Sequence, residues 1–154
     1  MIETERKFLL ADQHWPTPER SISIRQGYLA QADHLVCRVR QKDQVFFLSI
    51  KSSIDEQSSY DFEYPIPAAD GRIMLDELCT RPPVAKTRHL IKYDHLTWEV
   101  DEFHGLNQGL TVAEIELPSP EFVLNLPDWI GEEVTSDSRY RNAALYTCPY
   151  QSWT

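Results

Sequence analysis

The sequence has few cysteines: Cys37, Cys79 and Cys148 are widely spaced and odd in number. Such a set argues against a disulfide framework or a thiolate metal site and fits a reducing cytoplasm. Long apolar runs are also lacking, so no segment is expected to cross a bilayer. The N-terminus is charged from its third residue, which argues against a secretory signal. The five histidines show no spacing typical of metal ligands. We therefore expect a cytoplasmic protein without a membrane segment.

Basic residues are scarce as well, with 15 Lys and Arg against 24 Asp and Glu and a formal net charge of −9. A surface with this balance repels nucleic acid and anionic membranes, so neither is an expected partner. A site for a polyanion must instead be a local concentration of Lys and Arg, and the placement of these residues matters more than their number. The length of 154 residues, without a linker or repeat, predicts a single domain over residues 1–154.

Alternation with a period of two predicts eight short β-strands. They are expected at residues 2–9, 22–29, 34–41, 45–52, 59–66, 84–91, 96–103 and 110–117. Short helices are expected at residues 69–79, within 121–135 and at 138–147. The first helix carries an apolar stripe of Ile73, Met74, Leu78 and Cys79, which predicts core packing. Strands linked mostly by hairpins predict a mainly β (α+β) fold, either an eight-stranded antiparallel barrel or a strongly curved sheet, with a few flanking helices. An eight-stranded barrel can hold one small ligand inside.

Charges of one sign recur two residues apart on single strand faces. The pairs are Glu3/Glu5, Arg38/Arg40, Lys86/Arg88, Glu99/Asp101 and Glu114/Glu116. Periodicity alone leaves two arrangements open: charged faces outward around an apolar core, or inward around a polar lumen. A surface tuned for solubility interleaves its signs, although ladders of opposite charge across strands could also explain the pairs. Segregated signs favour a lumen in which cations hold an anion and carboxylates hold Mg²⁺ or Mn²⁺. A metal-bound polyphosphate needs both halves of such a site.

The N-terminal segment Glu3-x-Glu5-x-Lys7 resembles the ExExK signature of the CYTH domain family, also called triphosphate tunnel metalloenzymes. The match continues in the family's order through Arg38-x-Arg40, Lys51, Glu63, Lys86-x-Arg88, Asp101 and Glu114-x-Glu116. Residues 134–142 resemble the closing segment of the family, in which a basic residue approaches the ligand; either Arg139 or Arg141 could fill that role. The resemblance covers nearly the whole chain.

This resemblance implies an antiparallel barrel tunnel that binds triphosphate and a divalent metal, Mg²⁺ or Mn²⁺. Short single-domain bacterial members are similar to inorganic triphosphatases, in which a metal-positioned water attacks a terminal phosphorus of tripolyphosphate and releases pyrophosphate and phosphate. The implied phosphate ligands are Lys7, Arg38, Arg40, Lys51, Lys86 and Arg88, with Arg139 or Arg141. The implied metal ligands, or residues near the metal, are Glu3, Glu5, Glu114 and Glu116, with Glu63 and Asp101 completing the acidic wall.

Tyr28 and Lys86 are expected to form a pair near the scissile phosphate. Strand parity places Gln26 and Tyr28 on one face and Arg25 on the other, and we favour the face of Tyr28 for the cavity. Crowding by Arg88 could lower the pKa of Lys86, so that it orients or deprotonates water. Alternatively, Lys86 stays charged and only binds phosphate, because phosphoryl transfer runs largely on positioning and electrostatics.

Three other functions remain open. One is a class IV adenylate cyclase, or a thiamine or nucleoside triphosphatase, of the same fold; only Met1 and Ile2 precede the signature, so no N-terminal extension is expected to build a base pocket. Another is a module that captures polyphosphate without turnover. The third is a barrel with an apolar lumen, in which the charged rows face solvent and the inward residues are Leu35, Val39, Phe46, Leu48 and Ile50. The sequence also leaves open the metal, the substrate and a homodimer through an apolar barrel face.

Overall fold

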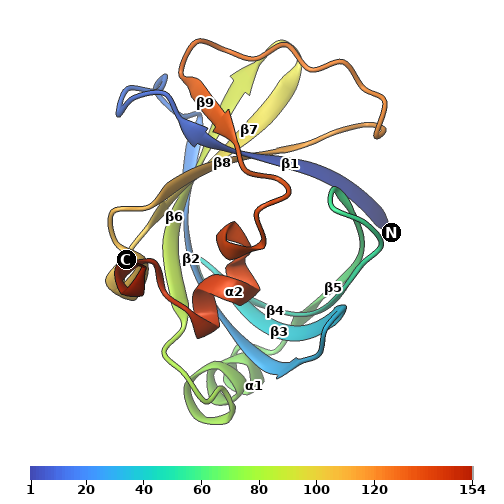
Figure 1. Cartoon of the computed structure of the whole chain (residues 1–154). Coiled ribbons are helices and arrows are strands. Elements are labelled where there is room, and N and C mark those ends of the chain that lie inside the picture. Colours follow the sequence, from blue (N-terminus) through green and yellow to red (C-terminus); the bar gives the residue numbers. More distant parts are fainter. Residues whose placement is uncertain (154) are drawn as a thin grey trace.

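The computed structural model describes residues 1–153 and consists of one strongly curved antiparallel sheet with short helices around it (Figure 1). The strands are β1 (Ile2–Leu10), β2 (Arg20–Gln31), β3 (Leu35–Lys42), β4 (Val45–Ser53), β5 (Ser58–Ile66), β6 (Val84–Tyr93), β7 (Leu96–Phe103), β8 (Thr111–Glu116) and β9 (Ile130–Glu133). The helical segments are α1 (Ala68–Ile73), η1 (Met74–Leu78), η2 (Gly105–Asn107), η3 (Ser138–Tyr140), α2 (Asn142–Thr147) and η4 (Tyr150–Ser152). All eight expected strands are present, with shifted ends.

The sheet closes into an eight-stranded barrel. Its strand order is β5-β4-β3-β2-β6-β7-β8-β1-β9, and β5 also pairs with β1. This closing seam is narrow, because only residues 2–4 of β1 pair with residues 58–60 of β5. The predicted barrel is confirmed. Among the described residues, no helix has the length and apolar character needed to traverse a bilayer.

The helix expected within residues 121–135 is wrong: this segment contains an irregular stretch and the ninth strand. Strand β9 pairs with the end of β1, where Ile130 lies opposite Leu10. A Cβ at Gly131 would lie 3.0 Å from the backbone nitrogen of Ala11, so the glycine permits this close approach. Arg6 on β1 fixes the strand further, since its Nε and Nη2 donate to the two carboxylate oxygens of Glu133 at 2.8 and 2.6 Å.

The helix expected at residues 138–147 is interrupted. Asp137 caps its first turn by accepting a hydrogen bond from the backbone N–H of Arg139 at 3.1 Å. Arg141 then adopts an extended conformation (φ −72°, ψ 140°), which separates the 3₁₀ turn η3 from α2. As a result, α2 begins at Asn142 and lies against the end of the barrel (Figure 1).

The helix expected at residues 69–79 forms, but its predicted apolar stripe is partly wrong. Ile73 and Leu78 are exposed, whereas Leu75 is buried. The reason is that α1 continues into the wider π-turn η1, in which the N–H of Cys79 bonds to the carbonyl of Met74. A π-turn rotates the following side chains relative to a 3.6-residue period. Leu75 therefore faces the core, where the sequence pattern had placed Ile73 and Leu78.

Gly71 sets how closely α1 approaches the sheet. A Cβ at this position would overlap the ring of Phe46 on β4. We therefore expect Gly71→Ala to lower the free energy of unfolding by about 1–3 kcal/mol, because overpacking outweighs the better helix propensity of alanine. Urea denaturation measures this, with Glu77→Ala on the exposed side of η1 as the control. An unchanged midpoint for Gly71→Ala would show that the packing between Phe46 and α1 is loose.

Apolar side chains form three clusters around the strands. One covers the outside of β1, β7 and β8 and includes Trp98, over which Trp15 and Trp129 pack. A second lies between the outer face of β3 and β4 and the helical segment α1–η1. The third fills one end of the barrel, where Leu145 and Tyr146 of α2 pack with residues of β2, β6, β7 and β8. The middle of the barrel is left to the polar rows of the strands.

Candidate active site

A cavity of about 270 Å³ lies in the middle of the barrel and is lined almost entirely by charged side chains. Its polar lining consists of Glu3, Glu5, Lys7, Arg38, Arg40, Lys42, Lys51, Asp61, Glu63, Arg88, Glu99, Glu114, Glu116 and Asn142. The charged faces therefore point inward. The alternative with an apolar lumen is wrong, because Val39 and Phe46 pack outside the barrel under α1 and η1.

A second cavity, of about 480 Å³, opens beside α2 and continues from the first. Four charged residues line both cavities: Glu5, Lys7, Arg38 and Lys51. Tyr28 and Arg141 line only the second cavity, and Leu35 and Ala143 add apolar surface to it. This larger space is therefore the mouth of the charged cavity in the middle of the barrel.

Two neighbouring arginines give the cavity an excess of positive charge on β3. Arg38 donates from Nη2 to Asp61 at 3.0 Å, and Arg40 donates from Nε to Gln26 at 3.0 Å. Burial, together with the adjacent cations Arg38 and Arg88, lowers the pKa of Arg40 to about 10, although Glu63 opposes the shift. The charged form of Arg40 is therefore disfavoured by its surroundings, and an anion in the cavity would stabilise it.

The carboxylates of the cavity are paired with the lysines and arginines around them. Burial alone would raise the pKa of Glu114, but the attraction of Lys7, Lys86 and Arg88 lowers it well below its ordinary value. Glu5 is also shifted down, mainly by Lys7. Lys51 lies 3.7 Å from Glu3 and 3.6 Å from Glu5. The cations and carboxylates thus pair with one another, and an anion could reach the cations only by exchanging with the carboxylates.

Asp101 and Lys86 are fully buried behind the cavity and are linked to it through Arg88. Lys86 donates to Asp101 and, at 3.1 Å, to Oδ1 of Asn142 on α2. Arg88 binds both oxygens of Asp101 at 2.7 Å and also contacts Glu99 and Glu114. Burial lowers the pKa of Lys86 to about 8 although Asp101 opposes the shift. The side chains of Lys86 and Asp101 are fully buried, so Lys86 stands one layer behind the open space.

Tyr28 is buried at the mouth of the tunnel, where its ring packs against Tyr146 with 5.0 Å between ring centroids. Its hydroxyl accepts a hydrogen bond from Nε2 of Gln26 at 3.0 Å. Burial raises the pKa of Tyr28, so the phenol is neutral near pH 7. The hydroxyl of Tyr28 and the ammonium of Lys86 therefore have separate hydrogen-bond partners in this structure.

Most of the residues expected at the site line one of the two cavities. The exceptions are Lys86 and Asp101, which lie behind the lumen, and Arg139, which pairs with Asp137 at 2.6 Å and is largely exposed. Of the two arginines left open, Arg141 is the one at the mouth. Sequence patterns gave no site role to Lys42, Asp61 or Asn142, and they gave Gln26 and Glu99 only a shared strand face with selected residues. Strand parity could have found Lys42 and Asp61 too, since each shares a face with a selected residue.

The carboxylates chemically suit a hard divalent cation. Glu3 is half-buried, and burial together with Asp61, Glu116 and Glu5 raises its pKa although Lys51 opposes the shift. Oδ1 of Asp61 is buried and has no hydrogen-bond partner in the described part of the chain. Within residues 1–153, no three Asp, Glu, His or Cys side chains are gathered closely enough to hold an ion by themselves. Oxygen donors completed by substrate oxygens and water are how Mg²⁺ is commonly bound, so these residues fit such an ion.

Comparison with known proteins gives one consistent family. The CYTH domain model matches residues 1–144. An inorganic triphosphatase of Acetivibrio thermocellus is 38% identical over 151 residues, covering 98% of this chain and 97% of that protein. An inorganic triphosphatase of Nitrosomonas europaea is 35% identical over 158 residues, covering 94% and 97%. The crystal structure of the inorganic triphosphatase NE1496 superposes with a TM-score of 0.67 at 35% identity, covering 94% and 93%.

The family match extends over the barrel strands and the α2 segment that together build the two cavities. It agrees with the closed antiparallel barrel and with the inward rows of opposite charge. On these grounds, the chain belongs to the CYTH domain family.

Proposed function

We propose that this protein hydrolyses inorganic tripolyphosphate to pyrophosphate and phosphate inside the barrel, with Mg²⁺ or Mn²⁺ as its cofactor. The observation that carries the proposal is the central cavity, in which cations from β1, β3, β4 and β6 face one small space. The two inorganic triphosphatases at 38% and 35% identity support it. A compact, highly charged chain of phosphates matches such a lining better than a ligand with an apolar part.

In this proposal, Lys7, Arg38, Arg40 and Lys51 bind the phosphate oxygens and neutralise their charge. Glu3, Glu5 and Glu116, with Asp61, hold the metal together with oxygens of the substrate, and Glu114 keeps Lys7 and Arg88 oriented. The bound metal would polarise the phosphoryl group and offset the charge that develops during transfer. Most of the rate enhancement then comes from positioning and fixed charge in a space with little water.

Lys86 acts from behind the cavity in this scheme. Its ammonium, held by Asp101 and Asn142, adds positive charge next to Arg88 and Glu114. The burial of its side chain and its pairing with Asp101 support a role for Lys86 in supplying charge and orientation. Direct contact with a water or phosphate would need the Asp101 contact to open.

Release of phosphate from tripolyphosphate in the presence of Mg²⁺ tests the proposal. We expect Glu5→Gln and Lys86→Met each to lower kcat/KM by about 100-fold or more, because each disturbs the charge that surrounds the reacting group. Lys92→Ala is the control, since its side chain is 68% exposed and lies outside both cavities. Circular dichroism checks that each variant folds. Chelation of the metal should abolish activity, and addition of Mg²⁺ or Mn²⁺ should restore it.

A second candidate is hydrolysis of an organic triphosphate. The mouth cavity of about 480 Å³ favours it, because Leu35, Val36 and Ala143 could contact an apolar group while the phosphates enter the lumen. Assays with ATP and thiamine triphosphate beside tripolyphosphate separate the two. Formation of cyclic AMP from ATP without loss of tripolyphosphate would instead indicate a cyclase. Tight binding of tripolyphosphate without phosphate release would indicate a binding module.

A further inference from the structure

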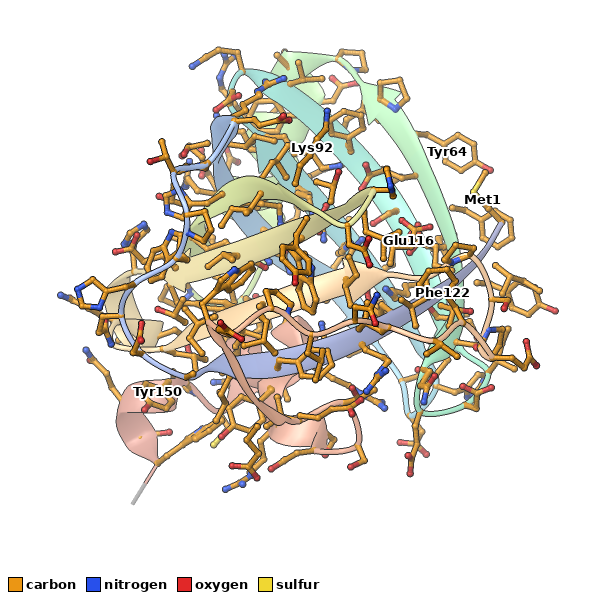
Figure 2. The ribbon with its side chains drawn as sticks, turned by 90° about the horizontal axis from the view of Figure 1, so that it is seen from above. Met1, Tyr64, Lys92, Glu116, Phe122 and Tyr150 are labelled. Carbon is orange, nitrogen blue, oxygen red and sulfur yellow. The ribbon has the colours of Figure 1, made fainter. Side chains whose placement is uncertain are left out.

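Asn142 lies where the two cavities of the barrel meet. Besides Asn142, the described residues that line both cavities are all charged: Glu5, Lys7, Arg38 and Lys51. These four belong to β1, β3 and β4, whereas Asn142 begins α2. In the perpendicular view of Figure 2, the C-terminal segment that follows α2 and carries Tyr150 lies at one end of the barrel. Asn142 therefore reaches the charged lumen from the closing segment of the chain.

The hydrogen bond with Lys86 fixes which way the amide of Asn142 is turned. Nζ of Lys86 lies 3.1 Å from Oδ1 of Asn142 and donates to it. An ammonium group has donors and no acceptor, so the atom that faces it must be the amide oxygen and not the nitrogen. Lys86 is fully buried and is held by Asp101 on its other side. The Nδ2 group of Asn142, with its two N–H donors, is therefore turned away from Lys86.

Nδ2 of Asn142 is a donor that opens onto the space between the cavities. Within residues 1–153, no carboxylate, hydroxyl or carbonyl accepts a hydrogen bond from it. The enclosed side-chain atoms of this part of the chain that lack a partner are Oγ of Ser59, Oδ1 of Asp61 and Nε1 of Trp98, so Nδ2 of Asn142 is accessible. Cations from β1, β3 and β4 line the same space. An acceptor that carries negative charge fits this combination of donors.

The backbone that carries Asn142 is held in place by contacts of α2 with the rest of the chain. The hydroxyl of Tyr146 accepts a hydrogen bond from the backbone N–H of Arg81 at 2.9 Å and donates to its carbonyl at 3.3 Å. Nε2 of Gln31 on β2 donates to the carbonyl of Ala143 at 3.2 Å. The amide of Asn142 is thus positioned before a ligand arrives, which lowers the entropic cost of binding.

An amide is suited to a position between a cation and an anion. Its oxygen accepts from the ammonium of Lys86, while its nitrogen can donate to an acceptor on the other side. A lysine or arginine at this position would add a cation next to Lys86, whose pKa burial already lowers to about 8 although Asp101 opposes the shift. A carboxylate at this position would repel an entering anion. The neutral amide avoids both costs.

We propose that Asn142 is a substrate-binding residue, in which Nδ2 donates to an oxygen of the phosphate group that lies nearest the mouth. Lys7, Arg38 and Lys51 line the same junction and neutralise the charge of that phosphate. Asn142 then links Lys86 to the substrate through one side chain. The inference rests on the proposed function for its choice of a polyphosphate as the ligand, but it concerns binding and not hydrolysis.

Selective isotope labelling tests this contact directly. The asparagines of the chain are Asn107, Asn125 and Asn142, so labelling asparagine with ¹⁵N gives one side-chain amide signal for each. Without metal, tripolyphosphate should shift the side-chain signal of Asn142 and leave those of Asn107 and Asn125, which line neither cavity. The variant Asn142→Leu assigns the signals by removing one of them. An unchanged Asn142 signal at a saturating concentration of tripolyphosphate would overturn the proposal.

A double-substitution cycle separates direct contact from an effect through Lys86. Isothermal titration with tripolyphosphate, without metal, should show binding weakened about 10-fold or more by Asn142→Leu, since leucine has a similar size and no donor. Asn125→Leu is the matched control, because Asn125 is exposed and lies outside both cavities. In the Lys86→Met background, direct contact predicts a further weakening by Asn142→Leu. If Asn142→Leu has no effect in that background, Asn142 acts through Lys86 alone and the proposal is wrong.

The failure of this inference is distinguishable from the failure of the proposed function. Tripolyphosphate that binds with a shift of the Asn142 signal, but is not hydrolysed with Mg²⁺, would support the inference and contradict the hydrolytic function. Hydrolysis by the wild type, with wild-type affinity for tripolyphosphate in Asn142→Leu, would contradict the inference alone. Circular dichroism checks the fold of each variant. If Asn142→Leu is unfolded, Asn142→Ala replaces it with the same expected weakening.

Discussion

Replacing Asp101 by asparagine should lower the free energy of unfolding by about 3–5 kcal/mol, because it leaves a buried cation without its counter-charge. The carboxylate of Asp101 is fully buried and is bound by both Lys86 and Arg88. Arg88 retains Glu99 and Glu114 in the variant, whereas Lys86 keeps the neutral amide oxygen of Asn142 as its remaining hydrogen-bond partner among the described residues. Asparagine preserves the shape of the side chain, so the loss measures charge and not packing.

The same experiment separates two roles for Asp101. The family resemblance placed it in the acidic wall around a metal, but its oxygens are occupied by Lys86 and Arg88. Glu116→Gln serves as the control, since Glu116 lines the cavity and is exposed. We expect Glu116→Gln to retain its urea midpoint and to lose activity. If Asp101→Asn is as stable as the wild type but binds Mn²⁺ more weakly, Asp101 is a metal ligand and not mainly a counter-charge for Lys86.

The grouping of the charges into rows could be predicted because strand parity is a local property. Arg38 and Arg40 must share a face wherever the strand lies, and so must Glu114 and Glu116. Which way the face points depends on what covers the other side, and this needs the tertiary structure. Lys42 was missed for a simple reason: the strand was expected to end at residue 41, whereas β3 continues to Lys42.

The parts that could not be predicted depend on contacts between distant segments. Asn142 reaches Lys86 across 56 positions of sequence because an extended residue, Arg141, redirects the chain into α2. Strand β9 forms because β1 offers it an edge, although its own four residues include a glycine and two glutamates. Local propensity carries little information about either feature. The position of Asn142 depends on its contact with Lys86, and β9 depends on its pairing with β1.

Replacing Arg40 by methionine should weaken the binding of tripolyphosphate by about 10–100-fold, because a hydrogen bond between charged groups contributes roughly 1.5–3 kcal/mol. Isothermal titration of the variant with tripolyphosphate, without metal and with Mg²⁺, measures the change. Arg25→Met is the control: Arg25 lies on the outer face of β2, is bound to Asp76 and is about half exposed. It should bind tripolyphosphate like the wild type.

The same Arg40 variant should be at least as stable as the wild type while no anion is bound. The pKa of Arg40 is lower in the folded protein, at about 10, than in the unfolded chain, because burial and the cations Arg38 and Arg88 disfavour its charge. The charged guanidinium therefore destabilises the fold throughout the pH range below about 10. Methionine removes that repulsion and loses one hydrogen bond to Gln26, so we expect a gain of about 1 kcal/mol in urea denaturation. A loss of stability together with unchanged tripolyphosphate binding would mean that Arg40 is a structural residue and that the anion lies elsewhere in the barrel.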